Sequence, residues 1–395
     1  MQEEMKNKHH TSLTIIFLMV NLVCIQPMKR RDILNTLLNT TEYDPRIAPD
    51  FERNEATRVH VQLSVISIDS INEVSMDYTL NAILRQTWID PRLNFSHLSN
   101  ISMLELDHRR MSDVWLPDTF FRNEKTATLH AITVPNKLLH ITNDGRVRYS
   151  IRVSLTLSCT MDLRFFPMDD QICSILAESY GYSIDNVHLM WEPKNSFIIQ
   201  TTDDEYSLPQ FYQHKPVETL KYSIVNPSNV EFSGLQAKLY LRRNLGYYMS
   251  QVFIPSILIV TLSWISFWIH VDAVPARVSL GVICVLTMTT QSAGVRNFLP
   301  RVSYIKAIDV WMAFGLLFVF AALLEYAYVN VQTRKHHKQV KKSEKKDKNG
   351  ETNDKEICPE YFMERARRVD RISRIVFPVS YILFNIVFWS AYLSK

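Results

Sequence analysis

Residues 275–291 read "PARVSLGVICVLTMTTQ", which combines the apolar composition of a membrane span with regularly spaced hydroxyl side chains. On an α-helix, residues at steps of three and four lie on one face. Here that face holds Ser279, Ile283, Leu286, Thr290 and Ala293. Hydroxyls inside a bilayer need water or a hydrogen-bonding partner, so this stripe favours either a water-filled path or close helix packing. One helix cannot enclose water, and a pore therefore requires several subunits around an axis.

The composition of the whole chain limits the classes of function. It has 395 residues, enough for more than one domain, and 47% of them are apolar. The formal net charge of +4 is too small to indicate nucleic-acid binding. The sequence contains no glycine-rich phosphate-binding motif, no HExxH or CxxC metal motif and no GxSxG nucleophile motif. We therefore expect no enzyme, no cofactor, no metal and no nucleic-acid partner.

The N-terminus predicts secretion. Lys6 and Lys8 precede an apolar run over residues 13–25, which is typical of a signal peptide covering residues 1–26. A short first membrane anchor is the alternative. On the first reading the following residues are extracellular. Three sequons agree with that side and are candidate glycosylation sites: Asn39, Asn94 and Asn100.

The five cysteines fall into different compartments. Cys24 belongs to the signal segment, Cys284 to an apolar run and Cys358 to a lysine-rich stretch. Only Cys159 and Cys173 lie in the secreted part, so we expect them to form a disulfide. A loop of this length should stabilise the fold by about 3 kcal/mol. Two free buried thiols are the alternative.

The extracellular part has the pattern of a β-sandwich. Apolar and polar residues alternate in several runs over residues 55–243, and "NDG" at 143–145 is a turn signal between two of them. A short helix capped by Asp32 is expected before the first strand. We therefore assign residues 27–244 to one extracellular ligand-binding domain, built as a β-sandwich.

Beyond Arg243 the chain becomes strongly apolar. Four runs are long enough to cross a bilayer: 246–269, 275–295, 305–331 and 375–393. We place the first three helices at 245–331 and the fourth at 373–395. The lysine-rich segment 332–372 is expected on the cytoplasmic side, without a fixed fold. The predicted class is a multidomain membrane protein in a lipid bilayer.

Several motifs resemble the pentameric Cys-loop receptors. These are the loop between Cys159 and Cys173 with Phe166 and Pro167 at its centre, "WLPDTFF" at 115–121, and "PARVSLG…TMTTQ". The resemblance extends from about Ile33 to the C-terminus. "YSIRVSLTLSC", "VPARVSLG" and "LPRVSYIKAIDVW" are most similar to the anion-selective branch, especially invertebrate glutamate-gated chloride channels.

This resemblance implies a ten-stranded extracellular sandwich and a four-helix transmembrane bundle. It also implies five subunits, the chain together with four others that are the same or homologous, around a chloride pore. The expected partners are a small-molecule transmitter and chloride ions, and the expected location is the plasma membrane, at a synapse on the postsynaptic side.

The resemblance also assigns roles along the pore segment. Ala276 stands where cation-selective relatives have an acid, and Arg277 would form a basic ring at the cytoplasmic mouth, with Arg296 adding a second. The alternative for Arg277 is contact with lipid headgroups. Leu286 occupies the position of the hydrophobic gate. Ile283 departs from the threonine of most anion-selective relatives and would lengthen the apolar constriction.

The transmitter site is implied between adjacent extracellular domains. Its residues would be Phe121, Ser179, Tyr180 and Phe232 from one subunit, with Arg85 and Ser150 from the next. Arg85 is expected to pair with a ligand carboxylate, and the aromatic rings to enclose a ligand ammonium group. Ordinary strand packing and a structural ion pair are the respective alternatives.

Two departures leave the ligand open. Ile66 stands where glutamate-gated relatives have a second arginine, and Ser223 and Gly234 stand where they have a second disulfide. A monocarboxylate amino acid, an amine, acetylcholine and protons are therefore alternative agonists. A non-conducting accessory subunit is the alternative function.

Overall fold

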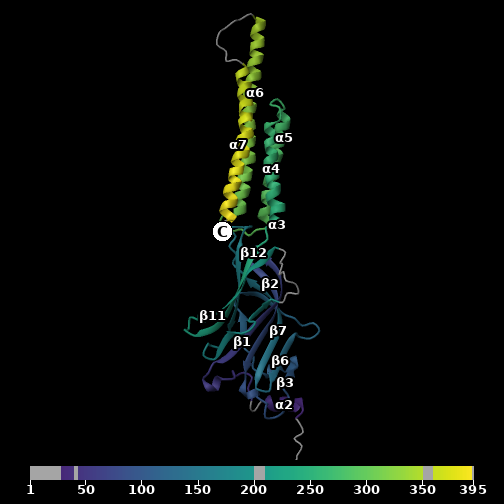
Figure 1. Cartoon of the computed structure of the whole chain (residues 1–395), viewed down its shortest axis with the longest axis vertical. Helices are drawn as coiled ribbons and strands as arrows, with labels where there is room; N and C mark the ends of the chain where they lie inside the picture. Colours follow the sequence, from purple (N-terminus) through teal and green to yellow (C-terminus); the bar gives the residue numbers. More distant parts are fainter. Residues whose placement is uncertain (1–27, 40–42, 200–209, 350–358, 394–395) are drawn as a thin grey trace, which may run out of the picture.

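The computed structural model describes residues 28–39, 43–199, 210–349 and 359–393, so the predicted signal peptide and Cys358 lie outside the described residues. Figure 1 shows an elongated molecule, with a β-domain at one end and a bundle of long helices at the other. The described chain includes each predicted sequon asparagine, and all three are exposed.

The β-domain is a sandwich of two sheets. The larger sheet has the order β10-β1-β2-β7-β6-β3, with β5 added on β7 and β9 on β1, and the smaller has the order β11-β12-β8-β4. The strands are β1 (Thr57–Asn72), β2 (Asp77–Ile89), β3 (Met103–Leu106), β4 (Thr119–Phe121), β5 (Glu124–Leu129), β6 (Lys137–Thr142), β7 (Arg146–Ser158), β8 (Asp170–Ser179), β9 (Val187–Trp191), β10 (Phe197–Ile199), β11 (Phe211–Val225) and β12 (Glu231–Arg243). The predicted β-sandwich is confirmed.

The described residues form twelve strand segments where ten were expected. Part of the difference arises between β4 and β5, because β4 pairs with β8 in the smaller sheet whereas β5 pairs with β7 in the larger one. The chain thus changes sheet at residues 122–123. The alternation seen in the sequence places one face of each long strand in the core, as in β2, where every second residue from Tyr78 to Trp88 is buried.

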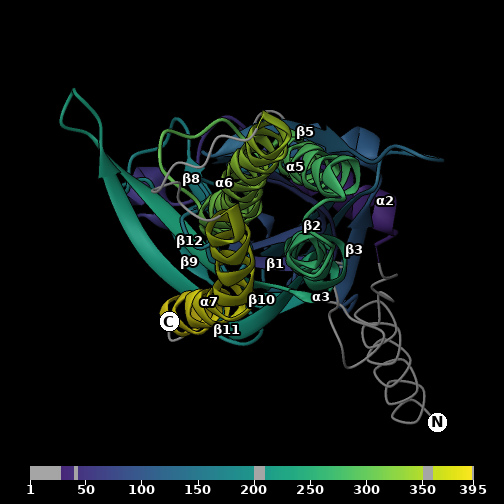
Figure 2. The same ribbon diagram turned by 90° about the horizontal axis from the view of Figure 1, so that it is seen from above.

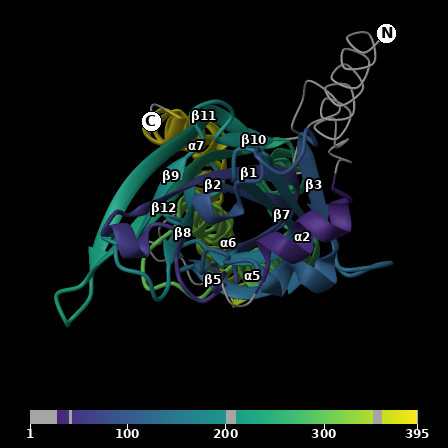
Figure 3. The same ribbon diagram turned by 90° about the horizontal axis from the view of Figure 1, so that it is seen from below.

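Short helical turns cover the sandwich away from the bundle. They are α2 (Arg30–Leu37), η1 (Phe51–Arg53), η2 (Pro91–Leu93) and η3 (His108–Asp113), and Figure 3 views this end. The prediction that Asp32 caps the first helix is wrong: the N-cap is Lys29, and Asp32 lies in the first turn of α2. A carboxylate there still favours the helix, because the first turn exposes main-chain N–H groups.

Cys159 and Cys173 form the predicted disulfide. It joins the end of β7 to β8, and the intervening loop (residues 160–172) reaches the helical bundle. The main-chain N–H groups of Ala307 and Ile308, at the start of α6 (Ala307–Asn349), donate to the carbonyls of Arg164 (2.9 Å) and Phe166 (3.2 Å). The disulfide therefore fixes a loop that is a direct contact between the two domains.

A buried arginine lies at the same junction. Arg243, the last residue of β12, forms ion pairs with Asp169 (2.7 Å) and with Glu73. Its guanidinium also lies 4.6 Å from the ring centre of Phe166. The last strand before the bundle is thus held to the disulfide loop and to the turn after β1.

Among the described residues, four helical segments are long and apolar enough to span a membrane: Gly246–Phe267, Val274–Asn297, Ala307–Lys341 and Glu360–Leu393. The first comprises α3 (Gly246–Tyr248), a π-helical segment η4 (Met249–Phe253), α4 (Ile254–Trp264) and η5 (Ile265–Phe267). The others belong to α5 (Val274–Asn297), α6 and α7 (Pro359–Leu393), which Figure 2 shows from above. The four predicted spans are confirmed as candidates.

The lysine-rich segment differs from its prediction. Residues 332–349 continue α6, and residues 359–372 already belong to α7. Lys, Glu and Gln are strong helix formers, and neither proline nor glycine interrupts the run before Gly350. Absence of an apolar period therefore did not mean absence of a helix.

Candidate functional site

Arg85 and Ser150 lie side by side on the outer face of the larger sheet. They are directly paired residues of β2 and β7, and Gln62 of β1 flanks Arg85 on the other side. Arg85 Nη1 donates to Ser64 Oγ (2.7 Å) and to Gln62 Oε1 (3.3 Å). These two hydrogen bonds orient the guanidinium across the sheet.

Arg85 has no ion-pair partner within the described chain. Burial and the neighbouring Arg148 both lower the pKa of Arg85, and no carboxylate offsets them. A guanidinium that is oriented and partly buried without a counter-charge is suited to binding an anionic group in a planar, two-point contact. The predicted structural ion pair is therefore not formed among these residues.

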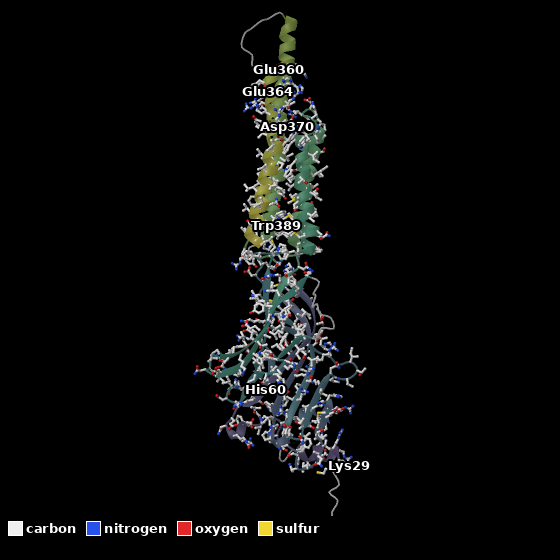
Figure 4. The ribbon with its side chains drawn as sticks, in the orientation of Figure 1. Lys29, His60, Glu360, Glu364, Asp370 and Trp389 are labelled. Atoms are coloured by element: carbon white, nitrogen blue, oxygen red, sulfur yellow. A yellow bond between two sulfur atoms is a disulfide. The ribbon has the colours of Figure 1, made fainter. Side chains whose placement is uncertain are left out.

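A hollow of about 820 Å³ lies next to this row of the sheet. His60, labelled in Figure 4, pairs with Thr87, two residue pairs along the strands from Gln62 and Arg85. Arg58, Arg146 and His188 also line the hollow, together with the acids Asp50 and Glu55. Because both signs of charge are present, this hollow does not by itself indicate an anion site.

The other predicted ligand residues lie on the smaller sheet. Tyr180 is 75% exposed just beyond β8, and Phe232 is half-buried in β12. Ser179 is buried, and its hydroxyl donates to Asp118 Oδ1 at 2.7 Å. Ser179 thus shapes the turn that presents Tyr180, rather than offering a free hydroxyl.

Phe121 was predicted on the ligand surface, but it lies in the core of the sandwich. Its neighbour Phe120 takes the outer position and contacts Tyr180 edge-to-face, with ring centres 5.4 Å apart. Successive strand residues point to opposite faces, so only one of the two phenylalanines can face outward. That alternation was the signal in the sequence that could have identified Phe120.

A polar network that the sequence did not indicate lies in the same row of the smaller sheet as Phe120. Glu178 pairs with both Phe120 and Gly234 in the sheet, and its carboxylate is nearly buried. Glu178 Oε1 accepts hydrogen bonds from Tyr222 Oη (2.6 Å) and Arg122 Nη1 (3.3 Å). Burial and the hydrogen bond to Glu178 raise the pKa of Tyr222, so its hydroxyl remains a donor.

This network fastens the β11–β12 hairpin where relatives were expected to have a second disulfide. Gly234 lies under the ring of Tyr222, and a Cβ there would meet that ring at 2.7 Å. Ser223, which with Gly234 stands where the second disulfide was expected in relatives, pairs with Ser233 in the hairpin. A hydrogen bond to a buried carboxylate thus stands in place of a covalent link.

Tyr222→Phe is expected to loosen this hairpin by about 1.5–3 kcal/mol, because it removes a hydrogen bond to a charged acceptor. Gly234→Ala should have a similar effect by displacing the Tyr222 ring. Backbone amide exchange in β11 and β12 measures the change. Unaltered exchange in both variants would show that the Tyr222–Glu178 bond does not hold the hairpin.

The two groups of candidate ligand residues do not meet within one chain. Arg85 and Ser150 face outward from the larger sheet, whereas Phe120, Tyr180 and Phe232 belong to the smaller sheet. A site that uses both needs two copies or homologues side by side. Ile66, which replaces the expected second arginine, lies at a β-bulge between Val65 and Ser67 and offers no charge.

α5 has one exposed face. The five stripe residues are exposed, with Ile283 at 58% and Leu286 at 64%, and the opposite side packs against α4 and α6. The hydroxyls of Ser279 and Thr290 donate to carbonyls of their own helix, each at 2.8 Å. Ala276 is exposed three residues before Ser279, and α5 contains no acidic residue.

Arg277 differs from its predicted position. Its side chain is 1% exposed and forms an ion pair with Asp370 of α7 at 2.8 Å. Residues two apart on a helix point about 200° apart, so Arg277 lies on the face opposite Ser279. The expected ring of free guanidinium groups does not fit this geometry. Arg296 remains largely exposed, 3.9 Å from Asp309.

Two models of protein families match the chain. The neurotransmitter-gated ion-channel ligand binding domain matches residues 30–245, and the neurotransmitter-gated ion-channel transmembrane region matches residues 252–357. Proteins of this kind are not enzymes; they are pentameric channels of the plasma membrane with an extracellular N-terminal domain that binds a small molecule. The matches cover most of the chain and divide it where strands give way to helices, so this chain belongs to the neurotransmitter-gated ion-channel family and is one subunit of such a channel.

Proposed function

We propose that the chain is a subunit of a chloride channel of the postsynaptic membrane, opened by glutamate or a related small carboxylate transmitter. The observation that carries the ligand class is Arg85, an oriented guanidinium on the outer face of the larger sheet that has no counter-charge among the described residues. A carboxylate would supply the missing anion, and Ser150 beside it would add a hydroxyl.

The neighbouring subunit would hold the other end of the ligand. Phe120, Tyr180 and Phe232 form an aromatic group, and rings of this kind attract an ammonium group through their faces. The carboxylate of Glu178 lies next to Phe120 in the sheet, and its charge is paired with Arg122. An α-amino acid offers a carboxylate and an ammonium group and matches both faces. Because Ile66 supplies no second cation, only one ligand carboxylate has a strong partner.

The support for an anion pore is the exposed face of α5. From Ala276 to Ala293 it carries hydroxyl and apolar side chains and no carboxylate. Five helix N-termini would meet at the cytoplasmic mouth, and each adds positive potential from its unpaired N–H groups. Leu286 and Ile283 form two apolar rings that would close the pore by excluding water. The charge of Arg277 is offset by Asp370 and is not needed for this preference.

The domain boundary is proposed at residues 244–245, where ligand binding would act on the pore. Closure of the β11–β12 hairpin would move β12 and Arg243 relative to the disulfide loop. That loop is hydrogen-bonded to the start of α6. Such a junction can shift the population between closed and open arrangements.

A non-conducting accessory subunit is the second candidate function. The observation that favours it is Ile283, which is exposed one turn from Leu286 and would lengthen the apolar constriction of the pore. An agonist that is an amine, acetylcholine or a proton would use the aromatic side chains and not Arg85. Both alternatives can be separated by recording from the chain expressed alone under a panel of transmitters.

Arg85→Ala tests the ligand class. If a carboxylate binds Arg85, the variant should lose about 2–4 kcal/mol of binding, which raises the half-maximal agonist concentration well over tenfold. Arg85→Lys keeps the positive charge but lacks the planar guanidinium, so its half-maximal agonist concentration should lie between those of the unmodified channel and Arg85→Ala. Concentration–response curves provide the measurement, with Phe232→Ala as the comparison.

An amine ligand predicts the reverse order, with a large shift for Phe232→Ala and little or none for Arg85→Ala. If both variants respond like the unmodified channel to every agonist, the site is not at this interface. Ile66→Arg should strengthen the binding of glutamate more than that of monocarboxylates. Only glutamate has a second carboxylate that can pair with the new arginine.

A further inference from the structure

A buried polar cluster joins three helices near the end of α5 that lies farther from the β-domain. Arg277 of α5 donates to both oxygens of Asp370 on α7, at 3.1 and 2.8 Å, and to the carbonyl of Ile269 before α5. Side-chain exposure is 1% for Arg277 and 4% for Asp370. Figure 4 shows Asp370 on α7, level with the distal end of α4 and α5. This ion pair is therefore internal to one subunit.

Glu325 of α6 is the third member of this cluster. It lies beside Asp370 and Ser373 and close to Arg277. Both of its carboxylate oxygens are buried, and neither accepts a hydrogen bond from any described residue. Asp370, as a carboxylate, has no proton to donate to it. Two acidic side chains, Asp370 and Glu325, thus lie near the single guanidinium of Arg277.

Two of the nearby donors are engaged elsewhere, which leaves the hydroxyl of Ser373 beside Glu325. Arg374 donates to the carbonyl of Phe267 and lies over the ring of Trp268, 4.5 Å from its centre. The hydroxyl of Tyr326 points to the carbonyl of Val274, at 3.5 Å. A second ionised carboxylate in this place would be buried with only the guanidinium that Asp370 already binds and the hydroxyl of Ser373 beside it, which is costly in a protein interior.

We propose that Glu325 is a neutral carboxyl group that donates its proton to Asp370, and that the two acids are positioning residues for Arg277. The O–H of Glu325 then satisfies one lone pair of Asp370, and the remaining lone pairs bind the guanidinium. The cluster is neutral as a whole. It ties the cytoplasmic end of α5 to α6 and α7 and holds Arg277 away from the exposed face of α5. This inference needs only the subunit fold and not the proposed chloride or ligand assignment.

The test uses full-length pentamers in detergent, with melting followed by size-exclusion chromatography. Glu325→Gln keeps the shape and an N–H donor for Asp370, so its melting temperature should stay within about 2 °C of the unmodified channel. Asp370→Asn removes the counter-charge of the buried Arg277 guanidinium and should lower the melting temperature by about 10 °C. An equal loss in both variants overturns the neutral assignment.

The double variant gives a sharper result. In Asp370→Asn, Glu325 can release its proton and partly replace the lost counter-charge. Glu325→Gln should therefore be far more damaging in the Asp370→Asn background than alone, a non-additivity expected only for side chains that interact directly. Simple addition of the two effects contradicts the proposed proton sharing.

Infrared spectroscopy provides an independent readout that does not depend on the Asp370 variants folding. A protonated carboxyl group has a C=O stretching band at higher frequency than a carboxylate. Glu325→Gln should remove one such band from the spectrum of the unmodified channel at neutral pH. Identical spectra in this region, or failure of Glu325→Gln to assemble, would overturn the proposal.

Discussion

Cys159→Ser is expected to abolish pentamers at the cell surface. The bridge closes a loop whose cross-link contributes about 3 kcal/mol. That loop carries the carbonyls that bind the start of α6 and the ring beneath Arg243. Loss of the bridge therefore weakens the sandwich and its junction with the membrane domain together. Surface biotinylation and size-exclusion chromatography measure the outcome.

The matched variants make this result specific. Cys173→Ser should have the same effect, and the double serine variant should be no worse than either single one, because all three lose one bond. Cys284→Ala removes a buried thiol that forms no disulfide and should leave assembly largely intact. Normal surface pentamers from Cys159→Ser would show that the bridge is dispensable.

Ala276→Glu is expected to change the ion preference of the pore. Ala276 is exposed on the same helix face as Ser279, so five glutamates would place a negative ring at the cytoplasmic mouth. Such a ring attracts cations and repels chloride, and the reversal potential should move away from that of chloride. Ala276→Gln has a similar size without charge and should leave it unchanged. Equal reversal potentials in both variants would remove Ala276 from the selectivity region.

Local patterns in the sequence were sufficient for much of the fold. Alternating strands, four apolar runs and two cysteines on the extracellular side follow from periodicity and compartment, and the structure has all three. Propensity could also have extended α6 and α7, since the lysine-rich segment is made of helix formers. Its charge was given too much weight against its helix propensity.

The placement of Arg277 shows where linear motifs mislead. Its position beside Ala276 suggested the pore mouth, although helix geometry already set it about 200° from Ser279. Its partner Asp370 is 93 residues away in the sequence, and no local pattern joins the two. The same holds for Glu178 and Tyr222, which are 44 residues apart and meet only through sheet pairing. Long-range polar partners of this kind become visible only in the folded chain.

Phe120 and Phe121 illustrate a smaller and avoidable error. Both belong to β4, and the alternation of that strand allows one to face outward. Resemblance to a family identifies the motif, whereas strand geometry identifies which of its residues is available to a ligand.

The most direct test of the proposed function is the reversal potential of the agonist-evoked current. The chain is expressed alone, glutamate and other transmitters are applied, and external chloride is replaced by a large impermeant anion. For a chloride channel, the reversal potential should shift by about 59 mV for each tenfold change in the external chloride concentration. Replacing sodium should leave it unchanged. A reversal potential that follows sodium would contradict anion selectivity, and surface pentamers without current under any transmitter would instead indicate an accessory subunit.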